Sequence, residues 1–276
     1  PISDKLSLGL SNFVSLINKS SLVGLDMKAL DERNKVASLD MYRKYGYRSY
    51  GLLWKMGIAT SFSSVNLGLT ITTPRINLNG KGSTLYGDYL VNVDTTGDGN
   101  TDDVYIYNIQ NNLEAKYKTP WAIGFGLGIN FKKAILHLSA EWFDKVNEYS
   151  ILETVPFNAQ STGDTLSFTV VDEMKPVFNY GIGLEWHFNK MISGFVSFAT
   201  DYSGVTSGIT RFAELDFETT NSVFQADFFK TGGGVSLNTK KIDITIGVVY
   251  TGASQQIERP INFPDEGNDP IFDSGL

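Results

Sequence analysis

Three observations predict an all-β fold, an antiparallel transmembrane β-barrel. The 276 residues combine 27 glycines with 18 phenylalanines, 13 tyrosines and 4 tryptophans, while the mean hydropathy of the chain stays close to neutral. Apolar residues recur at every second position over many segments. No apolar run is long enough for a membrane-spanning helix. Glycine and aromatic enrichment on alternating strands is typical of barrels that cross a membrane.

Nine segments carry this alternation, and each is predicted to form one strand. In residues 121–131 the odd positions hold Trp121, Ile123 and Phe125, whereas the even positions hold alanine, glycine and asparagine. This period of two residues is that of a strand and not of a helix. In chain order the predicted strands lie near residues 6–10, 50–58, 65–72, 121–131, 136–142, 177–188, 192–202, 229–237 and 241–250.

The composition of the two strand faces separates a barrel from a soluble sandwich. A sandwich buries its apolar face and exposes a charged one. Here the polar face is instead rich in small residues, with isolated charges, as expected on the concave side of a closed sheet. A tilted strand crosses the bilayer hydrocarbon in about 9–11 residues. Because the apolar stripes have this length and carry aromatic residues at both ends, we expect the bulky face to contact lipid.

The connections predict the orientation in a membrane. Tight turns at residues 63–64, 132–133, 189–190 and 238–240 alternate with long connections at residues 17–44, 79–103, 154–165 and 205–220. Barrels of the Gram-negative outer membrane have short periplasmic turns and long extracellular loops. We therefore expect the tight turns in the periplasm and the long loops outside the cell.

The strand count is odd, whereas single-chain bacterial barrels have even numbers of strands. The sequence also shows neither an initiator methionine nor a signal peptide. We therefore expect residues 1–276 to be a single β-barrel domain that is an incomplete fragment, lacking N-terminal strands with any hatch, and the final strand or strands.

Composition excludes several other classes of protein. With 23 Lys+Arg against 30 Asp+Glu, the net charge of −7 argues against a nucleic-acid partner. Without cysteine, neither a disulfide framework nor a thiolate metal site is available. A hydrophobic content of 42% excludes a disordered or collagen-like chain.

Polar residues on the small face are predicted to line the lumen. Histidine, serine and acidic residues together would also fit a hydrolase, but no Gly-x-Ser-x-Gly motif occurs and these residues face away from lipid. A hydrogen-bonded polar network is the better interpretation, so no enzyme is predicted. The predicted lumen residues are Lys55, Asn66, Asn130, His137, Ser139, Glu141, Asn179, Glu185, His187, Asp201 and Asp243.

The first long connection is predicted to contain a short amphipathic helix within residues 19–33, with Ser20 or Ser21 as its N-cap. Two interpretations stay open. Its apolar side chains pack on the barrel rim, or they form an outer groove where apolar ligands first bind. The residues concerned are Leu22, Val23, Leu25, Met27 and Leu30.

The second long connection contains Asp94, Asp98, Asn100 and Asp102 around Gly99, which are its candidate Ca²⁺ ligands. This pattern resembles the Asp-rich calcium loops of EF-hand-like proteins and thrombospondin type 3 repeats. Thr96 and Tyr105 replace two acids of the full pattern. Either the loop binds calcium weakly, or it is a solvated turn; no other cofactor is expected.

Three prolines stand at the outer ends of apolar stripes: Pro74, Pro120 and Pro176. Proline removes a donor from the strand ladder and is confined to margins, edges and bulges. These residues either mark where regular pairing ends or open the wall locally.

Three short segments carry a family resemblance: residues 118–128 (KTPWAIGFGLG), 136–144 (LHLSAEWFD) and 179–186 (NYGIGLEW). They resemble the FadL-like family of outer-membrane transporters for long-chain fatty acids and aromatic hydrocarbons. The resemblance implies a barrel of about 14 strands with an N-terminal hatch, but the Asn-Pro-Ala motif of the hatch does not occur in this sequence.

The resemblance implies a function as well: an outer-membrane channel for passive uptake of hydrophobic small molecules such as long-chain fatty acids. The expected partners are then outer-membrane lipid and those small molecules. Some relatives instead serve secretion systems. The alternative is therefore a non-transporting barrel that docks a secreted or surface protein, with other outer-membrane or secreted proteins as partners.

Overall fold

The computed structural model describes residues 3, 5–30, 34–95, 97–206, 218–220, 226–239 and 242–254. Most of these residues lie in β-strands, and within these ranges no helix occurs. A helix long and apolar enough to cross a membrane is accordingly not found in this part of the chain. The predicted all-β, antiparallel architecture is confirmed.

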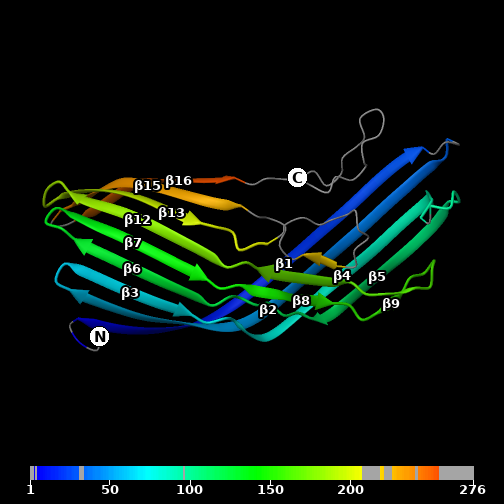
Figure 1. Cartoon of the computed structure of the whole chain (residues 1–276), viewed down its shortest axis with the longest axis horizontal. Coiled ribbons are helices and arrows are strands. Elements are labelled where there is room, and N and C mark those ends of the chain that lie inside the picture. Colours follow the sequence, from blue (N-terminus) through cyan, green and yellow to red (C-terminus); the bar gives the residue numbers. More distant parts are fainter. Residues whose placement is uncertain are drawn as a thin grey trace.

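Eleven antiparallel strands form one large curled sheet (Figure 1). Its order is β16-β15-β13-β12-β7-β6-β3-β2-β4-β5, and β1 pairs with β2. The strands are β1 (Leu6–Leu30), β2 (Val36–Phe62), β3 (Val65–Thr72), β4 (Ile76–Val93), β5 (Asp102–Glu114), β6 (Ala122–Asn130), β7 (Ala134–Phe143), β12 (Val177–His187), β13 (Ile192–Asp201), β15 (Asp227–Asn238) and β16 (Asp243–Ser254).

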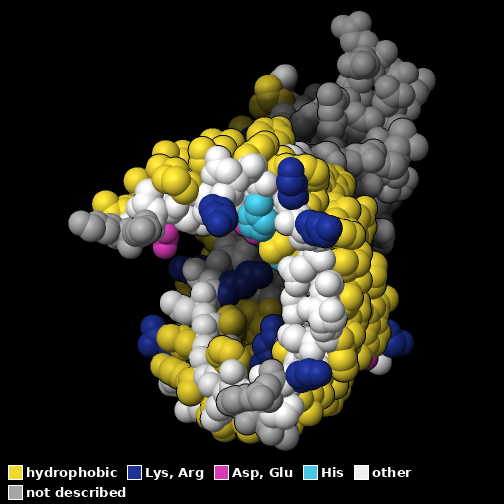
Figure 2. Space-filling view, turned by 90° about the vertical axis from the view of Figure 1, so that its left-hand side faces the viewer, with side chains coloured by type: hydrophobic (Ala, Val, Ile, Leu, Met, Phe, Trp, Pro, Cys, Tyr) yellow, Lys and Arg dark blue, Asp and Glu magenta, His cyan; other side chains and the backbone are white. Residues whose placement is uncertain are grey.

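All nine predicted strands are present, as β1, β2, β3, β6, β7, β12, β13, β15 and β16. Seen from its tight-turn end, the sheet curls into an incomplete ring whose outer surface is hydrophobic (Figure 2). Among the described residues, no strand pairs with the outer edge of β1 or of β16, so the ring is not closed. We call this curled portion the barrel part.

β1 and β2 are far longer than a membrane crossing requires. They pair without interruption from Leu6↔Thr60 to Leu30↔Val36. Their distal halves, together with β4 and β5, extend beyond the barrel part toward the upper right of Figure 1. We call this portion the extension.

Two small sheets accompany the extension. One has the order β14-β11-β8 and contains β8 (Val146–Glu153), β11 (Thr169–Met174) and β14 (Glu218–Thr220). The other is the hairpin of β9 (Phe157–Asn158) and β10 (Thr165–Leu166). β8 follows β7 after two residues, and β11 leads into β12. Strands β7 and β12 of the barrel part are thus continuous along the chain with β8 and β11.

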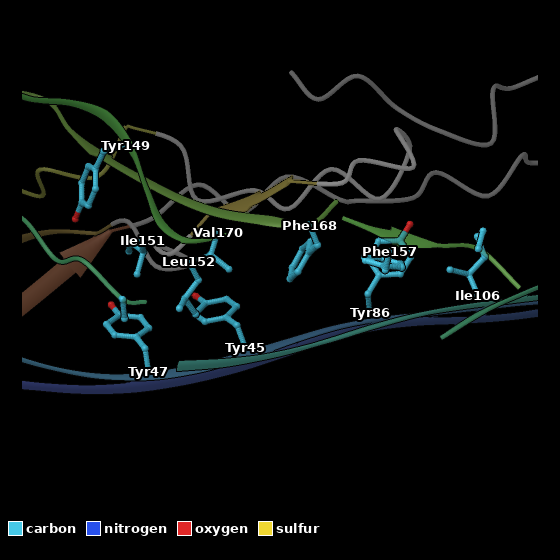
Figure 3. Close-up of a cluster of buried hydrophobic side chains, with 12 residues drawn as sticks. Tyr45, Tyr47, Tyr86, Ile106, Tyr149, Ile151, Leu152, Phe157, Phe168 and Val170 are labelled. Atoms are coloured by element: carbon cyan, nitrogen blue, oxygen red, sulfur yellow. The ribbon is translucent and has the colours of Figure 1, made fainter. Parts of the chain in front are cut away.

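A buried core holds these strands against the extension. Tyr45 and Tyr86 point from β2 and β4 toward Phe168 and Val170, and all four are at most 1% exposed (Figure 3). The ring centroids of Tyr86 and Phe168 are 5.9 Å apart, in the edge-to-face arrangement that aromatic pairs favour. The whole core cluster is Tyr45, Tyr47, Tyr86, Ile106, Ala115, Tyr149, Ile151, Leu152, Phe157, Ala159, Phe168 and Val170.

The helix predicted within residues 19–33 is wrong. Residues up to Leu30 continue β1, each paired with a residue of β2; residues 31–33 lie outside the described ranges. The side chains of Val23, Leu25 and Met27 recur every second residue, and all three are less exposed than their neighbours. Pairing along the full length of β2 therefore outweighs the local helix-start signal.

The long connections at residues 17–44 and 79–103 are also mostly strand, as the β1–β2 and β4–β5 hairpins. By contrast, the three prolines lie where the sequence placed them, at strand margins. Pro74 separates β3 from β4, Pro120 separates β5 from β6, and Pro176 separates β11 from β12. Each proline lies where the chain passes between a strand of the barrel part and a strand of the extension or of the small sheet that contains β11.

Candidate functional site

The inner face of the barrel part is built from rows of glycines and small polar residues. In one row Asn66, Gly128, His137 and Gly183 lie opposite one another across β3, β6, β7 and β12. Glycine is needed at positions where a neighbouring side chain occupies the space that a Cβ atom would fill. A Cβ at Gly181 would lie 2.7 Å from the Oγ of Ser139, closer than such atoms approach. The glycines thus leave room on the inner face for the polar side chains beside them.

Two neighbouring hollows open on this face. The larger has a volume of about 730 Å³, and its lining includes Asn66, His137, Ser139, Glu185 and Phe195. The smaller, of about 420 Å³, is lined in part by Lys55, Glu141 and Asn179, and it shares Ser139 with the first. Seven of the predicted lumen residues therefore surround the two hollows: Lys55, Asn66, His137, Ser139, Glu141, Asn179 and Glu185.

The other four predicted lumen residues lie nearer the strand ends. Asp201 ends β13 and forms an exposed ion pair with Lys230 at 2.6 Å. Asp243 begins β16 opposite Asn238, and Asn130 ends β6. His187, at the end of β12, contacts Ser193, which the sequence did not single out.

The histidine–serine–acid contact at this end does not form a catalytic relay. The Nδ1 atom of His187 lies 2.9 Å from the Oγ of Ser193 and 3.6 Å from the Oε1 of Glu185. A serine hydrolase needs one ring nitrogen on the nucleophile and the other on the acid. Because one nitrogen faces both groups here, the contact is a polar network at the strand end.

The outer face of the barrel part is apolar and exposed. Phe125, Ile182 and Leu184 are 46%, 48% and 38% exposed. Along β2 the outward apolar positions run from Tyr50 to Phe62. At about 3.3 Å per residue and a tilt of about 45°, this band is roughly 28 Å tall, close to the about 25 Å of membrane barrels. A water-facing sheet of this size would not normally expose so much apolar surface.

Arg75 lies between β3 and β4 at the distal side of the hollows, and only 5% of it is exposed. Its Nη2 donates to the Oγ of Ser49 at 3.0 Å, and its Nη1 donates to the carbonyl of Tyr117 at 3.0 Å and to Asn77. Its Nε has no hydrogen-bond partner among the described residues. A Cβ at Gly51 would overlap this Nε, so glycine is required there.

Beyond Arg75, β8 and β11 fill the space over the inner face. The odd-numbered residues of β2 show this continuity, because Lys55 lines a hollow while Tyr45 and Tyr47 belong to the core cluster. Burial raises the pKa of the Tyr45 phenol to about 12, and it raises the pKa of Tyr149 as well. The polar hollows therefore pass into a packed, water-poor core on the side of the extension.

A buried ion pair lies within the extension. Arg43 donates two hydrogen bonds to Asp88, at 2.6 and 3.1 Å, and both side chains are about nine-tenths or more buried. The guanidinium also stacks on Tyr86 at 3.6 Å from the ring centroid, and the Tyr86 hydroxyl donates to Asp88 at 2.7 Å. Such a bidentate pair, with further hydrogen bonds to both partners, is compatible with burial.

The five residues of the predicted outer groove do not share one surface. Leu22 and Leu30 lie on the outward face of β1 and are 64% and 67% exposed. Val23, Leu25 and Met27 lie on the opposite face and are partly buried. Strand geometry separates them, because successive side chains point to opposite faces.

The Asp-rich loop is folded by its own carboxylates. Asp94 accepts hydrogen bonds from the backbone of Gly97 and Gly99 at 2.7 and 2.8 Å. Asp98 accepts from the backbone of Asn100, and Asp102 accepts from the Thr95 hydroxyl. Within the described ranges, which omit Thr96, no three acidic or histidine side chains are grouped so as to hold a metal ion. Calcium binding stays a prediction.

No family model matches the chain, and no curated protein matches it. Among solved structures, the chain is similar to the toluene transporter TbuX of Ralstonia pickettii, with a TM-score of 0.44 and 11% sequence identity. The match covers 91% of this chain and 63% of that one, so the chain spans less than two thirds of its length.

Proposed function

We propose that this protein is an outer-membrane channel for passive uptake of hydrophobic small molecules, such as long-chain fatty acids. The observation that carries the proposal is the two-sided sheet of the barrel part. Its outer face exposes bulky apolar residues, including Phe125 and Ile182, and its inner face encloses hollows lined by small and polar side chains. Tight turns face the periplasm, and the extension lies outside the cell.

The packed core beyond the hollows favours apolar cargo over ions or sugars. A polar solute needs a continuous wet path, whereas the core cluster fills the inner face of the extension. Apolar cargo gains about 25 cal/mol for each Å² that it removes from water. The larger hollow also contains Phe195, so it offers apolar contact beside Asn66 and His137. Uptake is passive, with no cofactor and no chemical step.

Uptake of a labelled long-chain fatty acid into liposomes that contain the protein tests this function. Gly126 lies on the inner face, and a Cβ there would meet nothing within 4 Å. Gly126→Trp is therefore expected to fill the hollow and reduce flux at least several-fold. Phe125→Trp, on the lipid-facing side of the same strand, is the matched control and is expected to keep normal flux. Flux equal to that of empty liposomes would reject the transporter.

The open ring is part of the proposal. The outer edge of β5 is covered, because Gln160 pairs with the backbone of Tyr107, and Gln110 with that of Val155. The edges of β1 and β16 have no such cover among the described residues. Both strands run away from the tight turns, so closure by antiparallel pairing needs an odd number of further strands.

Spin labels at Leu8→Cys and Ile246→Cys test this closure, since the chain contains no cysteine. Both positions are exposed on the two edge strands. The labels are expected to be much farther apart than the about 5 Å between adjacent strands. A separation typical of direct neighbours would show that β1 and β16 close the ring themselves.

The alternative function is docking of a secreted or surface protein, and one feature of the extension favours it. Tyr42, Tyr89 and Tyr105 form a contiguous aromatic group, with ring centroids 6.2 and 5.2 Å apart. Tyrosine is enriched at protein interfaces. A stoichiometric protein that co-purifies with the wild type, and is lost in Tyr89→Ser/Tyr105→Ser, would support docking in place of uptake.

A further inference from the structure

On the outward face of the extension, a row that contains two basic residues lies just beyond the apolar band. Leu16, Tyr50 and Leu78 are exposed apolar residues on β1, β2 and β4. The next outward row along the strands is Asn18, Arg48 and Lys81, which lie directly opposite one another. Lys44 stands farther out on the same face of β2, and Lys116 follows β5. We call Lys44, Arg48, Lys81 and Lys116 the basic cluster.

This arrangement is electrostatically unfavourable for the isolated chain. Like charges directly opposite each other on paired strands destabilise a sheet, and Arg48 is opposite Lys81. On its other side Lys81 faces Glu114, but that carboxylate forms an ion pair with Lys116 at 3.2 Å. Among the residues that the structure describes, the Nζ of Lys81 donates only to the carbonyl of Asn112, at 3.4 Å. In the described part of the chain, the four cations of the basic cluster therefore have one neighbouring carboxylate, that of Glu114.

Acidic residues are not scarce elsewhere in this chain, which carries a net charge of −7. At the distal end of β1, Lys28 pairs with Asp26 at 2.9 Å, and Arg43 pairs with Asp88 inside the extension. By contrast, Lys44 and Arg48 form no ion pair with any residue that the structure describes. The missing negative charge points to an anion outside the chain.

The position of the cluster identifies that anion. Arg48 lies two positions from Tyr50, or roughly 7 Å along β2. The polar headgroup layer adds roughly 5–8 Å to each side of the hydrocarbon. Arg48 and Lys81 therefore lie at headgroup level when the apolar band is in the bilayer. Arginine binds phosphate through two parallel hydrogen bonds, and lysine binds it as a point charge.

We propose that the basic cluster binds phosphate groups on the headgroup of an outer-leaflet lipid, which fixes the height and tilt of the barrel part in the membrane. The proposal rests on the membrane location and orientation proposed above. Clusters of lysine and arginine next to a membrane-spanning segment recognise anionic headgroups in the same way. The lipid, and not free phosphate, is the ligand, because its acyl chains would lie against the exposed Leu16 and Leu78.

Titration of the detergent-folded protein with lipid A, followed by native mass spectrometry, tests the site. Wild type is expected to retain bisphosphorylated lipid A much more tightly than the dephosphorylated form. Arg48→Gln/Lys81→Gln is expected to weaken retention about 25-fold, since each cation contributes about five-fold. Arg48→Lys/Lys81→Arg keeps both charges and is the matched control, with affinity near that of the wild type. Millimolar inorganic phosphate is not expected to displace the lipid.

Three results would overturn the proposal. They are equal retention of the two lipid forms, retention unchanged in Arg48→Gln/Lys81→Gln, and displacement by free phosphate. Lys132→Gln/Lys133→Gln removes two exposed cations at the tight-turn end. Loss of lipid in that variant would place the phosphorylated leaflet on the wrong side and reject the orientation. Fatty-acid uptake is scored separately, so lipid retention without flux would reject the transporter and leave the lipid site standing.

Discussion

The barrel part and the extension share strands, but on the shared strand β2 they carry the bulky apolar side chains on opposite faces. On β2 from Tyr50 to Phe62 the even positions other than Thr60 are bulky and at least partly exposed, for example Met56 and Ile58 at 46% and 40%. From Met41 to Tyr47 the odd positions are bulky and at most 5% exposed, while the even positions are mixed. The side that carries apolar residues therefore reverses within one strand, close to Tyr50.

The reversal has a simple physical reason. Where hydrocarbon lies outside the sheet, apolar side chains are stable on the outer face and the inner face stays small and polar. Where water lies outside, the same strand must bury its apolar side chains inward, and β8 with β11 supply the partner surface. In the proposed location and orientation, the level of reversal lies at the outer edge of the membrane, next to Arg48 and Lys81 of the basic cluster.

Loss of the buried ion pair between Arg43 and Asp88 is expected to cause the largest difference in stability between the extension and the barrel part. Asp88→Ala leaves Arg43 buried without its partner and should lower the free energy of unfolding by about 3–5 kcal/mol. Lys230→Ala breaks the exposed pair with Asp201 and should cost about 0–1 kcal/mol. Urea unfolding in detergent compares the two. Equal effects would mean that the extension is no more tightly packed than the barrel surface.

Polarity on the lipid face is expected to have the next largest effect. Leu184→Arg places a charge in the middle of the apolar band and should destabilise the barrel part by about 2–4 kcal/mol. Gly183→Ser on the inner face should cost much less, since a Cβ there meets only ordinary contacts at 3.7 Å or more. Refolding into lipid vesicles at graded urea concentrations measures both variants. If Gly183→Ser proved as harmful as Leu184→Arg, the assignment of faces would be wrong.

Alkaline pH is expected to loosen the extension before the barrel part. The pKa of Tyr45 is about 12 in the folded protein, against about 10 in an unfolded chain. The unfolded state therefore loses this proton first, so stability is complete below about pH 10 and declines as pH rises toward 12. Protease cleavage of the extension, followed from pH 9 to 12, measures the decline. In Tyr45→Phe the decline should be weaker, and an unchanged profile would exclude Tyr45 as its source.

The smallest expected effect concerns the Asp-rich loop at the tip of the extension. Millimolar Ca²⁺ is expected to slow protease cleavage between residues 94 and 102, because carboxylate oxygens of Asp94 and Asp98 suit a hard cation. Asp98→Asn should abolish this protection without changing stability elsewhere. Cleavage that is equally fast with and without calcium would retire the metal site and leave a turn closed by its own hydrogen bonds.

The extension could be recognised only in part from the sequence. Residues 19–30 contain a good helix-start pattern, and residues 79–93 are rich in glycine and asparagine, so local signals favour a helix and a loop. The reversal of the apolar side near Tyr50 also breaks the long alternation that identifies a barrel strand. Shorter windows in β2 do alternate, at Met41, Arg43, Tyr45 and Tyr47, and this was the signal available.

The candidate site shows the same division. The sequence placed Asn66, His137 and Ser139 on the inner face because each occupies a position of its strand that alternates with the bulky apolar residues. It could not predict the contact of His187 with Ser193 or that of Arg75 with Ser49, because those contacts depend on strand register and on where each strand ends. The pairing of Arg48 with Lys81, on which the lipid site rests, is likewise a consequence of register.

By itself the sequence determined the nine strands of the barrel part, their two unlike faces and the alternation of tight and long connections. These follow from residue order, since side chains alternate along any strand. Only the tertiary structure decided that β1 and β2 continue into an extension and that β8 and β11 cover the inner face of this extension. It also decided that the four cations of the basic cluster lie near a single carboxylate. Those features depend on contacts between residues far apart in the chain, such as Tyr45 with Phe168 in one core, and no local pattern encodes which distant surface will exclude water.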